Sequence, residues 1–599
     1  MVLEYLLTLN GNFEWFIAVR LSLSKKKNTF SYVPGQEIYF SQSSFGWETE
    51  DESVNICRSR IGKIIFLFLL MYTIIILRIF DVCLVDGIHF NKEEVHYVKR
   101  RSGIITPVHR ANITDRNGVV VATNLPTVNL CTRPKKVSNA PIIAKKLSEI
   151  FNDTSYEDFL AKLNRKSGFV YLKRNISPLQ QAKVNALGFP ELEFQPSEIR
   201  VYPQKELLAH VLGTTNIDNI GIEGIEKTLN DRLTNSTKDL RLTIDLGVQY
   251  SVRDELIKAK EEFKAERATA ILMDINTSEI VALASVPDYD LNKRDFKDKD
   301  IKFNFATLGV YEAGSVFKVF NAALGLDSGK IKIHDKFDAR FPLKMGRHRI
   351  TDYRVPPKWL NVGETLIHSS NIASAQMALK VGKELQIKFF KNLGFFEKIQ
   401  NLEVFEKGKP IFRNEKSWKE HTVATTAFGY GISVTPVHII TAFSSILNGG
   451  IYTPPTLVID HNQRESKRVI SKQTSLDMRK LLREVVIQGS GKNANIPGYE
   501  VAGKTGTANK LVNNRYVKGK NITSFVSAFP ASAPKYALMV IIDDPKPTPK
   551  THGFVTSGWN ACPTGGKIIS RVAPQLNVRP NFDIAEQREK ILKNYGIND

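Results

Sequence analysis

The sequence predicts an α/β fold of the α+β type, in which a sheet backs a buried helix, together with an elongated N-terminal domain and one membrane-spanning helix. Three observations support this prediction. The apolar run at residues 316–324 is long enough for a buried helix. The segment TAILMDINTSEIVALAS at residues 269–285 predicts two strands joined by a short turn. An uninterrupted apolar stretch at residues 61–80 indicates the membrane helix.

The composition is that of a globular chain with several units. Its 599 residues suggest roughly three to four units, and 42% hydrophobic with 24% charged residues exclude a disordered chain. The net charge of +22 favours an anionic partner. Zinc-knuckle spacing and basic motifs interleaved with aromatic residues are missing from the sequence, so a membrane or cell-wall surface fits at least as well as nucleic acid. The four cysteines are spaced too irregularly to decide the compartment.

The membrane helix is predicted from IGKIIFLFLLMYTIIILRIF at residues 61–80. Lys63 and Arg78 can extend from its ends toward the lipid headgroups, so the segment reaches the ~20 residues that a bilayer core requires. A buried core helix and a cleaved signal peptide are the alternatives, but the apolar run is unbroken and no A-x-A-like site follows it. Basic residues before the run favour a cytoplasmic tail at residues 1–60.

Residues 81–240 are predicted to form a pedestal domain. Short strand-like runs alternate there with polar turns, and one helix is expected over roughly residues 140–162. Asp115 to Gly118 predict a turn that leads into a strand. Because this part of the sequence contains no catalytic or metal-like cluster, we expect it to support the rest of the chain.

The following region, residues 241–580, is predicted to form the second domain, with a tail at residues 581–599. Its first elements are a short strand and an amphipathic helix at residues 240–263, followed by the hairpin with its turn at residues 276–278. Thr435 and Pro436 are a helix start signal, and Gly449 and Gly450 end that helix after Leu447. Residues 524–543 predict two more strands with a turn near Ala533.

Ser315 and Lys318, in YEAGSVFK, are the candidate nucleophile and base. Residues three apart share a helix face, so the lysine amine can reach the serine hydroxyl. The surrounding Phe and Val residues imply burial, which lowers a lysine pKa and suits a general base near neutral pH. A surface serine and a solvated lysine are the alternative, since S-x-x-K also occurs at Ser22 and Ser24.

Two further motifs follow in order. Ser369, Ser370 and Asn371 precede a helical segment, and their hydroxyl and carboxamide groups could relay a proton and hold a substrate amide. Lys504-Thr505-Gly506-Thr507 precedes the last strands and predicts a strand edge along which an extended peptide can lie. The motifs that begin at Ser315, Ser369 and Lys504 follow one another in that order along the chain, and only this set combines the order with the spacing. Two other segments each match one motif but precede Ser315, namely Ser53-Val54-Asn55 and Lys166-Ser167-Gly168.

The ordered trio resembles that of class B penicillin-binding proteins, which are peptidoglycan D,D-transpeptidases, and is most similar to the septal, cell-division branch. The resemblance runs from the membrane helix to about Arg579. It implies the serine-acyltransferase, β-lactamase-like transpeptidase fold. Its segments are ITDRNGVVVA, RVYP, GIEGIE, LTIDLGVQ, LMDINTSEIVALASVP, YEAGSVFK, SSNIA, GYGISVTP and AGKTGTA.

The resemblance also implies a role for each motif residue. Ser315 would be acylated by the penultimate D-Ala of a stem peptide, with Lys318 as its base. Ser369 would relay protons, and Asn371 would bind the substrate amide. Lys504 would act electrostatically on the catalytic site, while Thr505, Gly506 and Thr507 would bind the substrate, the two threonines through its carboxylate. The backbone N–H groups of Ser315 and Thr507 would form the oxyanion hole.

The partners and location follow from the same resemblance. It implies stem peptides as substrates, β-lactams as covalent inhibitors, and a membrane glycan polymerase with other division proteins as partners. It implies a single-pass inner-membrane protein with a periplasmic catalytic domain. The same resemblance implies that the protein uses no cofactor or metal and binds no nucleic acid. The chain departs from the family pattern at Ala313, where proline is common, at Ser278, where glycine is usual, and in the segment Ala561 to Thr564.

Three alternatives share part of the pattern. A serine β-lactamase would use a glutamate to activate water, and Glu397 with Asn401 superficially mimics that motif. The membrane helix and the pedestal argue against it. A penicillin-sensing receptor would carry several membrane spans or a metal-site motif in its N-terminal half. An elongation-specific transpeptidase would share every motif and differ only in its cellular role.

Overall fold

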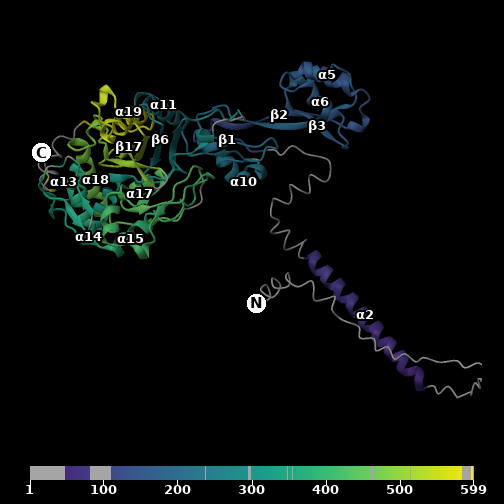
Figure 1. The fold of residues 1–599 in the computed structure, drawn as a ribbon, viewed down its shortest axis with the longest axis horizontal. Coiled ribbons are helices and arrows are strands. Elements are labelled where there is room, and N and C mark those ends of the chain that lie inside the picture. Colours follow the sequence, from purple (N-terminus) through teal and green to yellow (C-terminus); the bar gives the residue numbers. More distant parts are fainter. Residues whose placement is uncertain are drawn as a thin grey trace, which may run out of the picture. The chain divides into compact units, whose positions relative to one another are not determined.

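The structure is a computed structural model that describes residues 48–80, 110–236, 238–293, 299–346, 348–353, 355, 357–460, 464–512, 515–582, 595 and 597. The chain divides into two units, Met1–Val98 and Lys99–Asp599 (Figure 1). The first 47 residues of the predicted cytoplasmic tail, the first 29 of the predicted pedestal and most of the predicted C-terminal tail lie outside the described residues.

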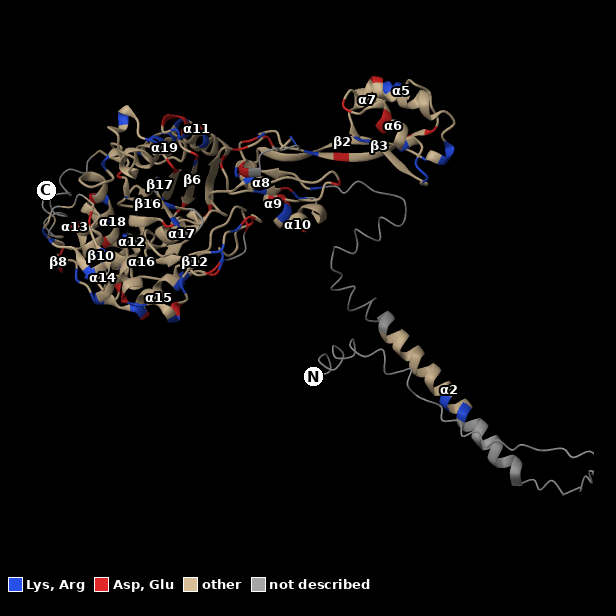
Figure 2. Cartoon of the chain, in the orientation of Figure 1, with Lys and Arg blue, Asp and Glu red and all other residues tan. Residues whose placement is uncertain are grey.

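The first unit contains one long helix, α2, at Glu48–Phe80. Its segment Arg60–Leu77 has a mean hydropathy of 2.2 and is not buried inside the protein, as a membrane span requires. Figure 2 shows the blue basic positions before an uninterrupted tan stretch. The predicted span at residues 61–80 agrees with this segment, and the helix itself is longer, because α2 starts 13 residues before residue 61. No Pro lies between residues 48 and 80, and the helix continues through Gly62.

The second unit begins with a five-stranded sheet in the order β3-β2-β1-β5, in which β4 also pairs with β2. The strands are β1 (Ile113–Thr114), β2 (Val120–Thr132), β3 (Val170–Ile176), β4 (Leu192–Val201) and β5 (Leu240–Arg241). The predicted turn before β2 is confirmed, with Gly118 at φ 89°. Helices α5 (Ala140–Ile150), α6 (Tyr156–Leu163) and α7 (Pro178–Asn185) enclose a separate small core with β2 and β3.

The prediction of one helix over residues 140–162 was therefore wrong. A turn separates α5 from α6, because Ser155 begins a new helix by accepting a hydrogen bond from the Asp158 N–H at 3.1 Å. The other end of the pedestal carries three short helices, α8 (Ala209–Leu212), α9 (Gly224–Thr228) and α10 (Asn230–Asn235). These helices share one hydrophobic core with residues 242–582, the predicted catalytic half of the chain.

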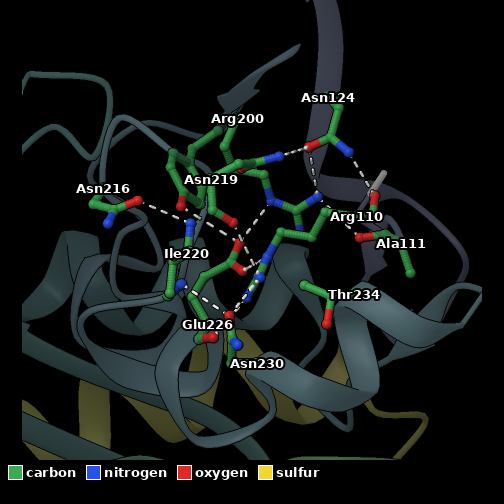
Figure 3. Close-up of polar contacts among 12 residues, drawn as sticks. Arg110, Ala111, Asn124, Arg200, Asn216, Asn219, Ile220, Glu226, Asn230 and Thr234 are labelled. Atoms are coloured by element: carbon green, nitrogen blue, oxygen red, sulfur yellow. Dashed lines mark hydrogen bonds and ion pairs between the residues drawn. The ribbon is translucent and has the colours of Figure 1, made fainter. Parts of the chain in front are cut away.

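A buried charge cluster joins α9 to the strands of the pedestal (Figure 3). The Glu226 carboxylate accepts hydrogen bonds from Arg110 Nε at 2.5 Å and from Arg200 Nε at 2.7 Å, and all three side chains are fully buried. Arg110 also donates to Asn230 Oδ1, and Arg200 to the Ala111 carbonyl oxygen. One carboxylate thus compensates two buried guanidinium groups that come from distant parts of the sequence.

The catalytic half is built on an antiparallel sheet in the order β16-β17-β18-β6-β7. Alternate residues of its strands face two cores: Leu538 and Val540 pack with α11 and α19, whereas Met539 and Ile541 pack with α12 and α17. Figure 1 shows α11 and α19 on one face and α17 and α18 on the other. The predicted sheet behind the buried helix is confirmed. Its strands are β6 (Arg267–Asp274), β7 (Ile280–Val286), β16 (Ala502–Val512), β17 (Arg515–Phe529) and β18 (Tyr536–Asp543).

The predicted hairpin β6–β7 and the helix start at Thr435 are both confirmed. Ser278, which stands where the family usually has glycine, adopts φ 57° in the hairpin turn. Thr435 Oγ1 accepts the His438 N–H at the start of α17. The helices of this half are α11 (Leu246–Glu262), α12 (Phe317–Asp327), α13 (Val362–His368), α14 (Asn371–Val381), α15 (Lys383–Asn392), α16 (Glu420–Thr426), α17 (Pro436–Leu447), α18 (Lys472–Ile487) and α19 (Ala561–Gln575).

Short strands and single 3-10 turns complete this part of the chain. The strand pairs are β8 (Phe337–Asp338) with β11 (Trp359–Leu360), β9 (Leu343–Met345) with β10 (His348–Ile350), β12 (Ile411–Phe412) with β13 (Ile432–Ser433), and β14 (Ile451–Tyr452) with β15 (Lys467–Arg468). The 3-10 turns are η3 (Pro134–Lys136), η4 (Lys299–Lys302), η5 (Gly314–Val316), η6 (Glu415–Ser417), η7 (Lys492–Ala494), η8 (Pro549–Thr551) and η9 (Ser557–Trp559).

Removing the central carboxylate of the buried cluster should strongly destabilise the pedestal. Glu226→Ala leaves Arg110 and Arg200 buried without their counter-ion, and we expect the free energy of unfolding to fall by about 3–5 kcal/mol. Glu149→Ala is the control, because it breaks an ion pair with Lys146 that is half exposed, and it should cost about 0–1 kcal/mol. Denaturant titration of both variants measures the difference, and equal losses would contradict a role for the cluster.

Candidate active site

Ser315 lies in the 3-10 turn η5, directly before helix α12. Gly314 enters this turn at φ 54°, and a Cβ on it would lie 2.8 Å from the Thr507 carbonyl oxygen. Gly429 packs against the same turn, since a Cβ added to it would lie 2.3 Å from the Gly314 carbonyl oxygen. Glycine is therefore needed at both positions, by backbone conformation and by space. Alanine at position 313 does not loosen the turn, as Ala313 is buried.

Lys318 lies on the first turn of α12 and is fully buried. Its Nζ is 3.0 Å from Ser315 Oγ and 3.1 Å from Ser369 Oγ, and it makes a short hydrogen bond to the Ser369 carbonyl oxygen. A neutral amine has two N–H donors and one lone pair. The two acceptors on Ser369 can take the donors, which directs the lone pair at the hydroxyl of Ser315.

Lys504 reaches the same serine from the sheet. Its Nζ lies 2.9 Å from Ser369 Oγ and 3.1 Å from the Thr505 carbonyl oxygen, and its side chain is fully buried. Both lysines thus contact Ser369 Oγ, which has two lone pairs to accept them. The hydroxyl proton of Ser369 remains available to a third group.

Burial lowers the pKa of both lysines. The pKa of Lys318 falls well below its ordinary value, first because its amine is desolvated and second because the Lys504 charge is close, while the Asp352 carboxylate partly offsets the fall. Desolvation lowers the pKa of Lys504 to about 7. An amine that is neutral near physiological pH can accept a proton from a serine.

Ser369 is held by the end of α13 and the start of α14. It adopts a left-handed conformation at φ 59°, ψ 44° as the C-terminal cap of α13, and this turns its carbonyl oxygen toward Lys318. The Asp352 carboxylate accepts the Ser370 hydroxyl at 2.5 Å and the backbone N–H groups of Asn371 and Ile372. Asp352 therefore anchors the start of α14, a role that no motif in the sequence indicated.

Asn371 is the first residue of α14, and its side chain does not join the hydrogen bonds around Ser315. Its Nδ2 donates to the Thr351 carbonyl oxygen at 3.0 Å. Within the part of the chain that the structure describes, no hydrogen bond links Asn371 to Ser315 or to either lysine. Its side chain instead contributes to the wall of a neighbouring cleft.

The segment from Lys504 to Thr507 lies on β16, the edge strand of the sheet, as predicted. A Cβ on Gly506 would lie 2.5 Å from the Ala313 carbonyl oxygen, so glycine lets the strand approach η5. Thr505 Oγ1 lies 2.6 Å from Ser490 Oγ, and Thr507 Oγ1 accepts the Ser557 N–H at 3.1 Å. Sequence reasoning missed Ser490 and Ser557, because neither belongs to a recognisable motif.

The structure thus brings Ser315, Lys318, Ser369 and Lys504 into direct contact from three distant segments. Thr505, Gly506 and Thr507 follow on the adjacent strand, and Asn371 lies two residues from Ser369. Glu397, the residue that mimics a β-lactamase motif, instead contacts Gln400 and His438. Among the described residues there is no group of three or more His, Cys, Asp or Glu that could hold a metal ion.

Comparisons with known proteins agree with this architecture. A family model for the penicillin-binding protein transpeptidase domain matches residues 268–557, and one for the penicillin-binding protein dimerisation domain matches residues 105–246. The chain is 34% identical to the probable peptidoglycan D,D-transpeptidase FtsI of Caulobacter vibrioides, over 79% of this chain and 82% of that one. It is 30% identical to stage V sporulation protein D of Bacillus subtilis, over 82% of this chain and 81% of that one.

A solved structure supports the fold. Penicillin-binding protein 3 of Mycobacterium tuberculosis, determined in complex with aztreonam, superposes with a TM-score of 0.63 at 21% identity, and the match covers 80% of this chain and 98% of that one.

The buried amine of Lys504 should make folding stability depend on pH. Its pKa of about 7 in the folded chain lies below the ordinary 10.5, so between these values the unfolded chain binds a proton that the folded chain has released. Stability should therefore rise with pH across this window, by about 1 kcal/mol per pH unit from this residue. Denaturant unfolding of the solubilised full chain at pH 7–10 measures the slope.

Lys504→Met should flatten this slope, because methionine binds no proton. Lys391→Met controls for the loss of one lysine, since Lys391 lies exposed on α15. A Lys504→Met variant that keeps the full wild-type slope would show that the buried amine stays protonated throughout.

Proposed function

Because the chain belongs to the class B penicillin-binding proteins, we propose that it is a peptidoglycan D,D-transpeptidase that cross-links stem peptides in septal wall synthesis through a serine acyl-enzyme. The observation that carries this proposal is the contact of two buried lysines with one serine hydroxyl, next to Ser315. β-Lactams would acylate the same serine and block the enzyme.

The first step is acylation of Ser315. The lone pair of neutral Lys318 takes the hydroxyl proton across 3.0 Å, and Oγ attacks the carbonyl carbon of the penultimate D-Ala. The backbone N–H groups of Ser315 and Thr507 stabilise the oxyanion that forms, and one such donor is typically worth about 3 kcal/mol. The C–N bond to the terminal D-Ala then breaks, and its amine takes the hydroxyl proton of Ser369 while Ser369 takes the proton held by Lys318 across 3.1 Å, so both residues return to their starting forms.

The second step transfers the acyl group to an amine of another stem peptide. The amine attacks the ester carbon and loses a proton, which returns through Ser369 and Lys318, and the Ser315 hydroxyl is restored. Lys504 donates a hydrogen bond to Ser369 Oγ, and in its protonated form, at and below its pKa of about 7, it also supplies positive charge that favours the anionic intermediate of both steps. The reaction joins two peptides and consumes no external energy source, because the released D-Ala is the leaving group.

The remaining motif residues would position the substrate. Thr505 and Thr507 would bind the carboxylate of the terminal D-Ala, with their hydroxyls oriented by Ser490 and Ser557. Gly506 would serve the substrate indirectly, because it lets β16 lie close against the turn that carries Ser315. Asn371 would bind a substrate amide once its bond to the Thr351 carbonyl oxygen opens.

The chain is membrane-anchored, and we propose that α2 crosses the inner membrane once and leaves the catalytic half in the periplasm. We place the tail before α2 in the cytoplasm because basic residues precede the apolar stretch. A membrane glycan polymerase and other division proteins would be its partners, since a transpeptidase acts on the peptides of newly made glycan strands. We propose the septal role from the overall likeness of the motif segments to the septal branch, supported by the 34% identity to the FtsI of Caulobacter vibrioides.

Penicillin labelling tests the nucleophile. A fluorescent penicillin should label the wild-type chain covalently, and Ser315→Ala should abolish the label because no oxygen remains to form the ester. Ser328→Ala is the matched control, since this serine caps the end of the same helix, where it bonds the Gly325 carbonyl oxygen and the Lys330 N–H and no motif residue. Persistent labelling of Ser315→Ala would refute the assignment.

Depletion of the protein tests the cellular role. A septal enzyme is required only when a cell divides, so depleted cells should grow into filaments that fail to form cross-walls. Microscopy of the host cells decides the outcome. Round cells would indicate an elongation role, and a defect confined to spores would indicate a sporulation role.

A further inference from the structure

A cleft adjoins the turn that carries Ser315. It has a volume of about 590 Å³, and its lining comes from β10, the start of α14, α16 with the loop that follows, and β17. Asn371, two residues after Ser369, belongs to one wall. Phe428 and Tyr430 belong to another wall, and Gly429 between them packs against the backbone of Gly314. The cleft is therefore connected to the nucleophile turn and to Ser369 by the residues that form its walls.

The charged residues that line this cleft are basic. Arg349 and Arg413 contribute exposed guanidinium groups, and no ion pair is found for either of them with a described residue. His348 and His421 also line the cleft, with ring centroids 4.9 Å apart. Aspartate and glutamate are missing from the described lining of the cleft. Two unpaired arginines in one concave site favour an anionic ligand.

Two acids that bond residues of the cleft or their neighbours are engaged in the protein. Asp352 accepts hydrogen bonds from Ser370 and from the start of α14. Glu312 is 6% exposed, and its carboxylate accepts the Gly431 N–H at 2.7 Å and the Tyr516 hydroxyl at 2.9 Å. Neither carboxylate lines the cleft, so neither neutralises the arginines there.

An aromatic wall gives the cleft a second recognition surface. The ring centroids of Phe428 and Tyr430 lie 5.8 Å apart, and those of Tyr430 and Tyr516 lie 6.0 Å apart. Glu312 fixes this wall through Tyr516 and Gly431. The flat faces of these aromatic rings can pack against the apolar groups of a peptide. The unpaired arginines beside them can bind a carboxylate of the same peptide.

We propose that this cleft binds a carboxylate of a stem peptide, with Arg349 and Arg413 as its donors. The inference rests on the proposed transpeptidase function and names the charge of the substrate that the site selects. A peptide whose end lies at Ser315 extends past Asn371 toward the two arginines, whose forked N–H groups match a carboxylate. The two arginines are specificity residues and do not touch the reacting atoms.

A pair of model peptides tests this proposal on the full chain. One is L-Ala-γ-D-Glu-L-Lys-D-Ala-D-Ala, and the other has the free glutamyl α-carboxylate replaced by a carboxamide. The donor arm of the experiment measures release of D-Ala from each pentapeptide. The acceptor arm measures transfer of the acyl group to the matching tetrapeptides. The wild type should prefer the acidic peptide by at least about tenfold in kcat/KM in one of the arms, as expected for a charge-assisted hydrogen bond.

The double variant Arg349→Gln/Arg413→Gln should lose this preference, whereas Lys388→Gln/Lys391→Gln, which removes the same charge from exposed positions on α15, should keep it. Penicillin labelling of every variant reports an intact fold and nucleophile. A wild type that labels and releases D-Ala but shows no preference in either arm, or a double variant that keeps the preference, overturns the cleft assignment alone. A wild type that neither labels nor releases D-Ala overturns the proposed function and the cleft together.

Discussion

Two buried lysine amines that meet at one serine hydroxyl are the interaction on which the rest of the site depends. Water would keep both amines protonated and useless as bases, but the core around Lys318 and Lys504 excludes water and lowers the pKa of each. Their mutual repulsion disfavours two full charges side by side. The arrangement therefore keeps one amine able to take the proton of Ser315 while the other supplies charge at Ser369.

The fold delivers these groups from three directions. The turn η5 carries Ser315 and the helix α12 after it carries Lys318, the junction of α13 and α14 carries Ser369, and the edge strand β16 carries Lys504. They can meet because the backbone passes unusually close at Gly314 and Gly506, where a side chain would collide with the facing strand or turn. A sheet with a hydrophobic core on each face holds these segments in place.

The sequence predicted the features that depend on local patterns. The three motifs, the β6–β7 hairpin, the start of α17 and the membrane helix each follow from adjacent residues. It did not predict Asp352, Glu312 or Ser490, because their partners lie far along the chain or carry no motif. The single helix expected over residues 140–162 has a different cause, because the Ser155 cap that begins a second helix is a local signal that the prediction overlooked. The boundaries predicted for the domains stay a prediction, since the base of the pedestal shares a core with the catalytic half.

The most direct test of this account is the acylation rate of Lys318→Met by penicillin, compared with the wild type across pH. If neutral Lys318 is the base, the variant should fold, retain Ser315, and acylate about 10²–10⁴-fold more slowly, and its rate should lose the rise with pH that deprotonation of Lys318 gives the wild type. A variant that acylates at the wild-type rate with the same pH profile would contradict the central claim.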